Sequence, residues 1–297
     1  MKIKKSKFLV FIVLIFFILS IFCCKKNTTA KTEDFSIVAS FYPMYIMLLN
    51  ITDGIDNINI SLLAPPNTGC LHDYQLTTKD MRLITESDAI IINGVDMEHF
   101  LEKVLDFNNE KVIIASKDYP ILDENPHIWV SPKGATYQVL QIAQGLANLD
   151  PENAEKYIEN GKKYAEKLNI LSQNLKTSLE KFSDVKIITF HESFTYFAQE
   201  FDLDFITTIE QEHGTEPSPK EIVKIIDQIN LLKNDGKKVL LFTEPNSVSS
   251  AAKIISNDLK LNIYNLDSAV TGEINKDAYI TAMKKNQKIL EEAFQSE

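Results

Sequence analysis

The segment PENAEKYIENGKKYAEKLNILSQNLKTSLEKF, residues 151–182, determines the expected architecture. Its larger apolar residues recur every three or four positions and charged residues fill most positions between them, which is typical of one amphipathic helix. At about 1.5 Å per residue, such a helix extends on the order of 45–50 Å, longer than a crossover within one small sheet requires. The pattern therefore predicts a stiff connector between two sheets, with Asp150 as its cap and Pro151 in its first turn. A coiled-coil dimer segment is the alternative. The expected buried stripe comprises Tyr157, Gly161, Tyr164, Leu168, Leu171, Leu175, Leu179 and Phe182.

On both sides of this segment, short β-type runs alternate with helical patterns. Several runs, such as AIII and VLLF, are continuously apolar, as expected of strands that helices cover on both faces. Alternating strands and helices favour parallel sheets. We predict an α/β fold of two lobes, each with a mostly parallel four-stranded sheet flanked by helices, joined by one long helix. The expected strands are 36–40, 58–63, 89–93, 112–116, 186–190, 204–208, 239–243 and 262–266. The expected helices are 77–86, 97–107, 133–148, 193–202, 219–234, 247–258 and 275–294.

The N-terminus has the pattern of an export signal. Lysines within residues 1–7 precede an apolar run at 8–22, which is shorter than the roughly 20 residues of a membrane span. A cysteine directly after such a run is similar to the lipidation site of bacterial lipoproteins, and Cys24 fits the pattern slightly better than Cys23. A retained anchor helix is the alternative. We predict a lipoprotein signal at 1–23, a polar tether at 24–34, an N-terminal lobe at 35–149, the connecting helix at 150–183 and a C-terminal lobe at 184–297.

Composition narrows the class of function. The net charge is −10, and removing the four lysines of the signal gives −10 − 4 = −14, which argues against nucleic acid or anionic lipid as a partner. Neither a GxGxxG nor a GxxxxGK[ST] motif is present, so nucleotide binding has no support. If Cys24 carries lipid, Cys70 is the one cysteine left in the mature chain, and a disulfide framework is excluded.

Three of the five histidines and one aspartate share a position, because each lies in a loop a few residues past a predicted strand. Ligands of open α/β sheets bind outside the carboxyl ends of the strands. Neutral imidazole is also the commonest metal-binding side chain. Four such loops, two in each half of the chain, predict one divalent-metal site assembled by the fold. The candidate ligands are His72, His127, His191 and Asp267.

The motifs around these residues resemble those of a known family. VASFYPM (38–44), NPHIWVSP (125–132), TFHESFTYFAQEFDL (189–203), EPSPKEI (216–222) and FTEPN (242–246) are similar to the metal-binding lipoproteins of bacterial ABC importers for zinc and manganese. These are solute-binding proteins with a rigid interlobe helix, and the resemblance covers essentially the whole mature chain. It implies His72 of a His-x-Tyr element, His127 of PHxW, His191 at the start of HESFTYF and Asp267 after the last strand as ligands. Histidine at the third position implies zinc, where glutamate often implies manganese.

The chemistry of this ligand set agrees with zinc. Zn²⁺ favours tetrahedral, nitrogen-rich sites, whereas Mn²⁺ prefers more oxygen, so a bidentate Asp267 would admit manganese as the alternative. Four protein ligands leave no open position of the kind that catalytic zinc uses. We therefore expect no enzyme, but a lipid-anchored, extracytoplasmic monomer that delivers the ion to an ABC permease. A surface adhesin with a structural metal and a metallohydrolase with Glu192 as base are the alternatives.

Four further residues receive supporting or neutral interpretations. Glu244 ends the seventh strand and is expected to support the site rather than bind the metal. Glu192 is a candidate to hold the second nitrogen of a ligand histidine. His99 is expected to be exposed, and His213 lies in a polar loop.

Overall fold

Two four-stranded sheets organise the fold, and the strands of each sheet run parallel. The first has the order β2-β1-β3-β4, and the second has the order β6-β5-β7-β8. This arrangement confirms the predicted two-lobed α/β class. The N-terminal strands are β1 (Phe35–Ala39), β2 (Ile58–Leu62), β3 (Ala89–Ile92) and β4 (Val112–Ile114). The C-terminal strands are β5 (Lys186–Thr189), β6 (Asp204–Thr208), β7 (Val239–Thr243) and β8 (Ile263–Asn265).

The structure is a computed structural model that describes residues 34–68, 71, 74–182, 184–209, 216–245 and 249–296. Five residues of the sequence analysis lie outside these ranges, namely Cys23, Cys24, Cys70, His72 and His213. The lipidation site and the first metal ligand therefore stay predictions, as do the lobe boundaries. Within the described ranges, none of the helices combines the length and the apolar character that crossing a membrane requires.

Helices cover both faces of each sheet. In the N-terminal lobe, α3 (Thr78–Glu86) packs on one face, and α2 (Tyr42–Ile51) and α4 (Pro132–Leu149) pack on the other. In the C-terminal lobe, α7 (Pro219–Asn234) and α8 (Ser250–Leu259) lie on one face, and α6 (Thr195–Phe201) and α9 (Ala278–Ser296) lie on the other. The inner faces share one continuous apolar core, which includes Ile37 of β1 and Leu240 of β7.

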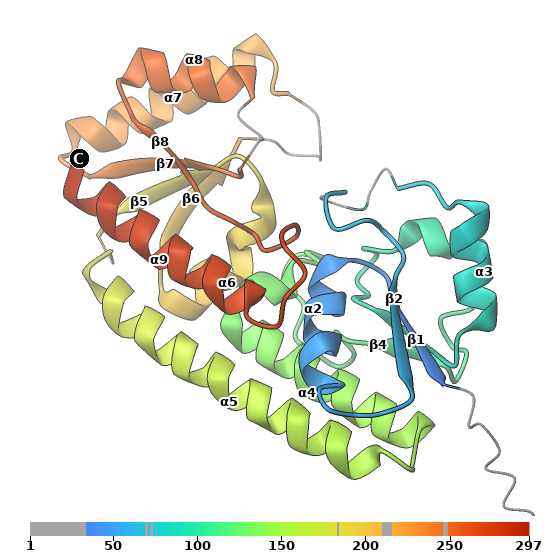
Figure 1. Cartoon of the computed structure of the whole chain (residues 1–297). Helices are drawn as coiled ribbons and strands as arrows, with labels where there is room; N and C mark the ends of the chain where they lie inside the picture. The colour runs from blue at the N-terminus through green and yellow to red at the C-terminus, as the bar shows by residue number, and fades with distance from the viewer. Residues whose placement is uncertain are drawn as a thin grey trace, which may run out of the picture. The chain divides into compact units, whose positions relative to one another are not determined.

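The long helix α5 (Ala154–Leu179) packs against elements of both lobes (Figure 1), and a short 3₁₀ turn, η3 (Glu180–Phe182), follows it. Every residue of the predicted stripe is buried. Gly161 permits close packing, because a Cβ there would lie 2.6 Å from the Cβ of Ala143 in α4. The predicted cap is wrong. Asp150 ends α4, its carboxylate accepts hydrogen bonds from Asn153 and Tyr157, and residues 151–153 form a turn before α5.

Glu200 of α6 connects the two lobes by hydrogen bonds. Its carboxylate accepts hydrogen bonds from the Ser131 hydroxyl and from the backbone N–H of Lys133 at the start of α4. The Ser172 hydroxyl of α5 donates to the same carboxylate at 2.5 Å. A carboxylate is favourable at the N-terminus of a helix, as here at the start of α4. The Glu200 side chain therefore connects its own helix, α6, to both α4 and α5.

Two helical segments differ from the prediction. The predicted helix at 97–107 is only a 3₁₀ turn, η1 (His99–Leu101), because the Glu98 carboxylate bonds back to residues at the end of β3, and the Asp106 side chain bonds the backbone N–H of Asn108. Helix α2, by contrast, is absent from the predicted set. It is buried almost all round and therefore lacks the amphipathic period by which a helix is recognised.

The parallel strands fix where the loops of interest lie. Because all strands of one sheet point the same way, the segments that follow them leave from the same edge. In the N-terminal lobe this edge leads to η1 and to η2 (Ile128–Val130). In the C-terminal lobe it leads to η4 (Glu192–Phe194) after β5 and to the loops after β7 and β8. Of the predicted ligands, His127, His191 and Asp267 lie on or directly beside these segments.

Candidate metal site

His127 and His191 meet at the junction of the two lobes. Their Nε2 atoms are 3.2 Å apart, and the two rings are nearly perpendicular, at 86°. His127 is 1% exposed and precedes η2, whereas His191 is partly buried and precedes η4. Two nitrogen ligands at about 2.0–2.1 Å from a tetrahedral zinc ion lie about 3.3–3.4 Å apart. The observed separation therefore suits two ligands of one ion, as well as a hydrogen bond between neutral imidazoles.

The side chain of Asn125 determines which nitrogen of His127 faces His191. The Asn125 Oδ1 atom is 2.9 Å from both the backbone nitrogen and the Nδ1 atom of His127. Because an amide oxygen only accepts hydrogen bonds, this contact favours the neutral tautomer with the proton on Nδ1, in which Nε2 keeps its lone pair. A ligand histidine needs this arrangement, with one nitrogen held and the other available to the metal.

The same asparagine connects the two lobes. Its Nδ2 atom donates to the carbonyl of Glu192 at 3.0 Å and to Oγ1 of Thr195 at 3.1 Å. The Tyr196 hydroxyl donates to the Asn125 carbonyl at 2.8 Å. These contacts fix the orientation of the amide and place His127 next to the segment that begins at His191. Asn125 is not among the residues predicted from sequence. The local pattern that could have indicated it is an amide two residues before His127, with Pro126 between them.

Asp267 occupies the expected place after β8, where it is partly buried. Its carboxylate accepts a hydrogen bond from the backbone N–H of Ala269, and the side chain of Asn286 in α9 pairs with both its N–H and its carbonyl. Asp267 also lines a cavity of about 240 Å³, together with Tyr42 of α2 and Gly272. Burial, with the charge of Asp267 as a smaller cause, raises the pKa of Tyr42 to about 12.

Glu244 holds the two C-terminal loops that carry His191 and Asp267. Its carboxylate accepts hydrogen bonds from the hydroxyls of Ser193 at 2.6 Å and Ser268 at 2.9 Å. The Ser268 carbonyl in turn accepts a hydrogen bond from Nε1 of Trp129, which belongs to η2 in the other lobe. The segments of His127, His191 and Asp267 are thus tied by hydrogen bonds, with the two imidazoles in direct contact. These hydrogen bonds agree with the supporting role expected of Glu244, which stays a prediction.

Among the described residues, the one group of three metal-type side chains whose ligand atoms all approach one another closely lies on the surface of the N-terminal lobe, and it does not include His127, His191 or Asp267. The ligand atoms of Asp96, His99 and Glu102 lie within 4.8 Å of one another, and all three residues are exposed. His99 Nδ1 is 3.1 Å from a carboxylate oxygen of Glu102 and 3.9 Å from one of Asp96. The predicted exposure of His99 is therefore confirmed.

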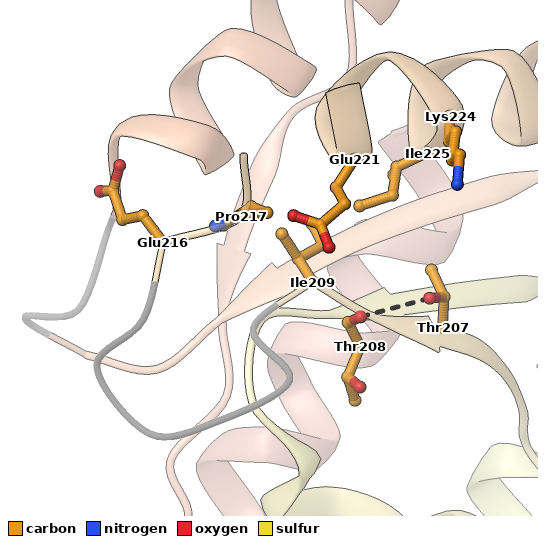
Figure 2. Close-up of a pocket in the computed structure, with 8 residues that line it drawn as sticks. All are labelled: Thr207, Thr208, Ile209, Glu216, Pro217, Glu221, Lys224 and Ile225. Carbon is orange, nitrogen blue, oxygen red and sulfur yellow. Dashed lines mark hydrogen bonds between the residues drawn. The ribbon is translucent and has the colours of Figure 1, made fainter. Parts of the chain in front are cut away.

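Residues of the motif EPSPKEI form hydrogen bonds at the N-termini of two helices, α7 and α8. Ser218 and Glu221 form a capping box on α7, with Pro219 at the first helical position. Glu216 accepts a hydrogen bond from the backbone N–H of Ser250 at the start of α8. Glu216 and Glu221 line a cavity of about 370 Å³, together with Thr207 and Thr208 at the end of β6 (Figure 2). None of its lining residues is one of the candidate ligands.

The fold has two α/β lobes, and one imidazole from each lobe lies at their junction. This arrangement is that of a two-lobed binding protein. Comparison with known proteins gives the family. Residues 37–293 match the family model described as zinc-uptake complex component A, periplasmic, and the chain belongs to this family. Proteins of this kind are described as substrate-binding components of metal transporters.

Individual relatives agree with this assignment. The chain is 27% identical over 295 residues to the high-affinity zinc uptake system protein ZnuA of Bacillus subtilis, covering 91% of this chain and 90% of the relative. It is 26% identical to the metal ABC transporter substrate-binding lipoprotein ScbA of Streptococcus cristatus, covering 97% and 98%. The structure of the solute-binding protein FpvC of Pseudomonas aeruginosa in complex with Mn²⁺ is similar with a TM-score of 0.78 at 29% identity, covering 89% and 99%.

Proposed function

We propose that this protein captures a divalent transition metal, zinc first, between its two lobes and passes it to an ABC permease. The ligands are His127 and His191, with Asp267 and His72 completing the set. The observation that carries the proposal is the 3.2 Å approach of two imidazole Nε2 atoms from different lobes. The contact that leaves His127 Nε2 with its lone pair supports it, because a metal ligand must be unprotonated.

The chemistry of the ligands favours zinc over manganese. Imidazole nitrogen suits Zn²⁺, whereas Mn²⁺ is better served by carboxylate, carbonyl and water oxygen. The carboxylate of Asp267 supplies the one charged oxygen of the set. The zinc uptake protein of Bacillus subtilis supports this choice, and the Mn²⁺ complex of the Pseudomonas relative supports manganese as the competing cargo.

The setting of this function is the outer face of a bacterial membrane. The signal pattern at 1–23 supports export, and we propose that lipidation at Cys24, with Cys23 as the alternative, tethers the chain as a monomer. A relative described as a metal ABC transporter substrate-binding lipoprotein supports the tether and the permease partner.

Competition between the protein and a chromogenic chelator for Zn²⁺ and Mn²⁺ tests the proposal. The full chain should bind one zinc ion tightly, and both His127→Ala and His191→Ala should lose at least about 100-fold in zinc affinity, since each removes one ligand of four. His99→Ala, which alters the exposed group, is the matched control and should bind as the unaltered protein does. Absence of tight binding of either ion, or unaltered binding in both ligand variants, would refute the proposed site.

A further inference from the structure

Glu98 is a buried carboxylate that the proposed site does not use. It is 1% exposed, and three donors converge on it. One oxygen accepts from the Ser40 hydroxyl at 2.7 Å and the Asn93 N–H at 2.8 Å, and the other accepts from the Gly94 N–H at 3.0 Å. Ser40 follows β1, and Asn93 and Gly94 follow β3. The carboxylate therefore ties the carboxyl ends of two neighbouring strands together.

The local backbone is built to bring these donors close. Gly94 has a φ of +85°, and a Cβ at this position would lie 2.6 Å from side-chain atoms of Ile114 and Ser116. Only glycine fits this conformation and this space, and it allows the N–H of Gly94 to reach the carboxylate. Burial of a carboxylate is unfavourable, and here burial raises the pKa of Glu98 to about 7 although its hydrogen bonds lower it. Because burying this carboxylate costs free energy, we expect Glu98 to have a specific structural or functional role.

Asn93 connects Glu98 to the segment of His127, because its backbone bonds Glu98 and its side chain bonds Pro126. It is fully buried, and its Nδ2 atom donates to the carbonyl of Pro126 at 3.0 Å and to the carbonyl of Gly94 at 2.9 Å. Its Oδ1 atom accepts from Gln138 of α4 at 2.8 Å. Pro126 directly precedes His127. The segment of His127 is thus held from the C-terminal lobe through Asn125 and from the N-terminal lobe through Asn93.

We infer that Glu98 is a positioning residue for the metal site: it fixes Asn93, and Asn93 fixes the Pro126 carbonyl, so that the His127 ring stands where it meets His191. This inference rests on the proposed function. The competing explanation is that Glu98 only locks β1 to β3. The two explanations differ in one respect, because a strand lock changes stability, whereas a positioning residue also changes the coordination geometry of the bound metal.

The test replaces Glu98 by Gln in the full chain and measures zinc affinity by chelator competition, together with the visible absorption spectrum of the Co²⁺-loaded protein. Glutamine keeps the size but places an N–H₂ group against one of the three donors. We expect about tenfold weaker zinc binding and a shifted Co²⁺ spectrum, as for other residues that orient metal ligands. Asn93→Ala removes the link to Pro126 and should reproduce both effects.

Asp150→Asn is the matched control, because Asp150 is also a buried carboxylate with two side-chain donors but belongs to the turn between α4 and α5. It should lower thermal stability and leave affinity and spectrum unchanged. If Glu98→Gln and Asn93→Ala behave like this control, the inference is overturned. If Glu98→Gln does not fold, Asn93→Ala and Ser40→Ala decide in the same way.

A measurement without metal separates this inference from the proposed function. Imidazole ¹⁵N chemical shifts report which nitrogen of His127 is protonated. Glu98→Gln should change the ¹⁵N shifts of the His127 ring, because the ring moves relative to Asn125 and His191 when the Pro126 carbonyl is released, and unchanged shifts would count against the inference. If zinc binding collapses in His127→Ala but is untouched in Glu98→Gln, the proposed function stands and only the role of Glu98 falls.

Discussion

Replacing Asn125 by Ala is the sharpest perturbation of the site that leaves every proposed ligand in place. The change removes both hydrogen bonds that the side chain accepts from His127 and both that it donates across the lobes. Two N–H groups of the buried His127 then lose their acceptor, at about 1–3 kcal/mol each, so the free energy of unfolding should fall by about 2–6 kcal/mol. The Glu192 carbonyl still accepts from Thr195 at 2.8 Å.

The effect on metal binding has a separate origin. Without the Asn125 acceptor, the tautomer of His127 with the proton on Nδ1 is no longer favoured, and the ring loses one of the contacts that orient it. Loss of such a contact typically weakens metal affinity by about 10–100-fold, which is about 1.4–2.7 kcal/mol of binding free energy. Chelator competition with Zn²⁺ measures this loss, and urea unfolding without metal measures the change in stability.

Two further variants divide the roles of this side chain. Asn125→Asp keeps an acceptor for both N–H groups of His127 and replaces the donors to the other lobe, so it should lose stability but retain zinc affinity. Thr195→Val removes one partner across the lobes and leaves His127 untouched, and should also retain affinity. Wild-type zinc affinity in Asn125→Ala, or an equal loss in Thr195→Val, would show that the tautomer argument is incorrect.

Four other predictions follow from the site and its supports. Zinc affinity should fall as pH drops through about 6.5, the ordinary pKa of histidine, because the ligands must be neutral; equal affinity at pH 5 and pH 7.5 would contradict the imidazole site. Because the pKa of Glu98 is about 7 in the folded chain and 4.5 ordinarily, its contribution to stability is fully present below pH 4.5 and declines by about 3 kcal/mol as pH rises through 7. Urea unfolding of Glu98→Gln across this range should lack that decline. Glu244→Ala should weaken zinc binding about tenfold, since Ser193 and Ser268 lose their common partner, whereas Glu216→Ala should affect only thermal stability. Solution scattering should give the same radius of gyration with and without zinc, because α5 and a continuous core join the lobes; a large compaction would refute a rigid junction.

Much of the architecture is already determined by local sequence. The strands are predictable almost to the residue, because most are short apolar runs bounded by polar or turn-forming residues. Helix α7 is predicted at its observed bounds, because Ser218, Pro219 and Glu221 form a complete start signal. The candidate ligands also follow from local sequence, since parallel strands deliver the residues after them to one edge.

Tertiary structure determined what surrounds those ligands. Asn125 lies 67 residues from Glu192, and Ser40 lies 58 residues from Glu98, yet each pair is joined by a hydrogen bond. No local pattern specifies such partners, because any buried polar group must find one and the choice depends on which loops the fold brings together. The same reason explains α2, whose burial on almost every side erases the period that would reveal it. Sequence therefore singled out His127 and His191, and packing alone decided the spacing and support of the two imidazoles where they meet at the junction of the lobes.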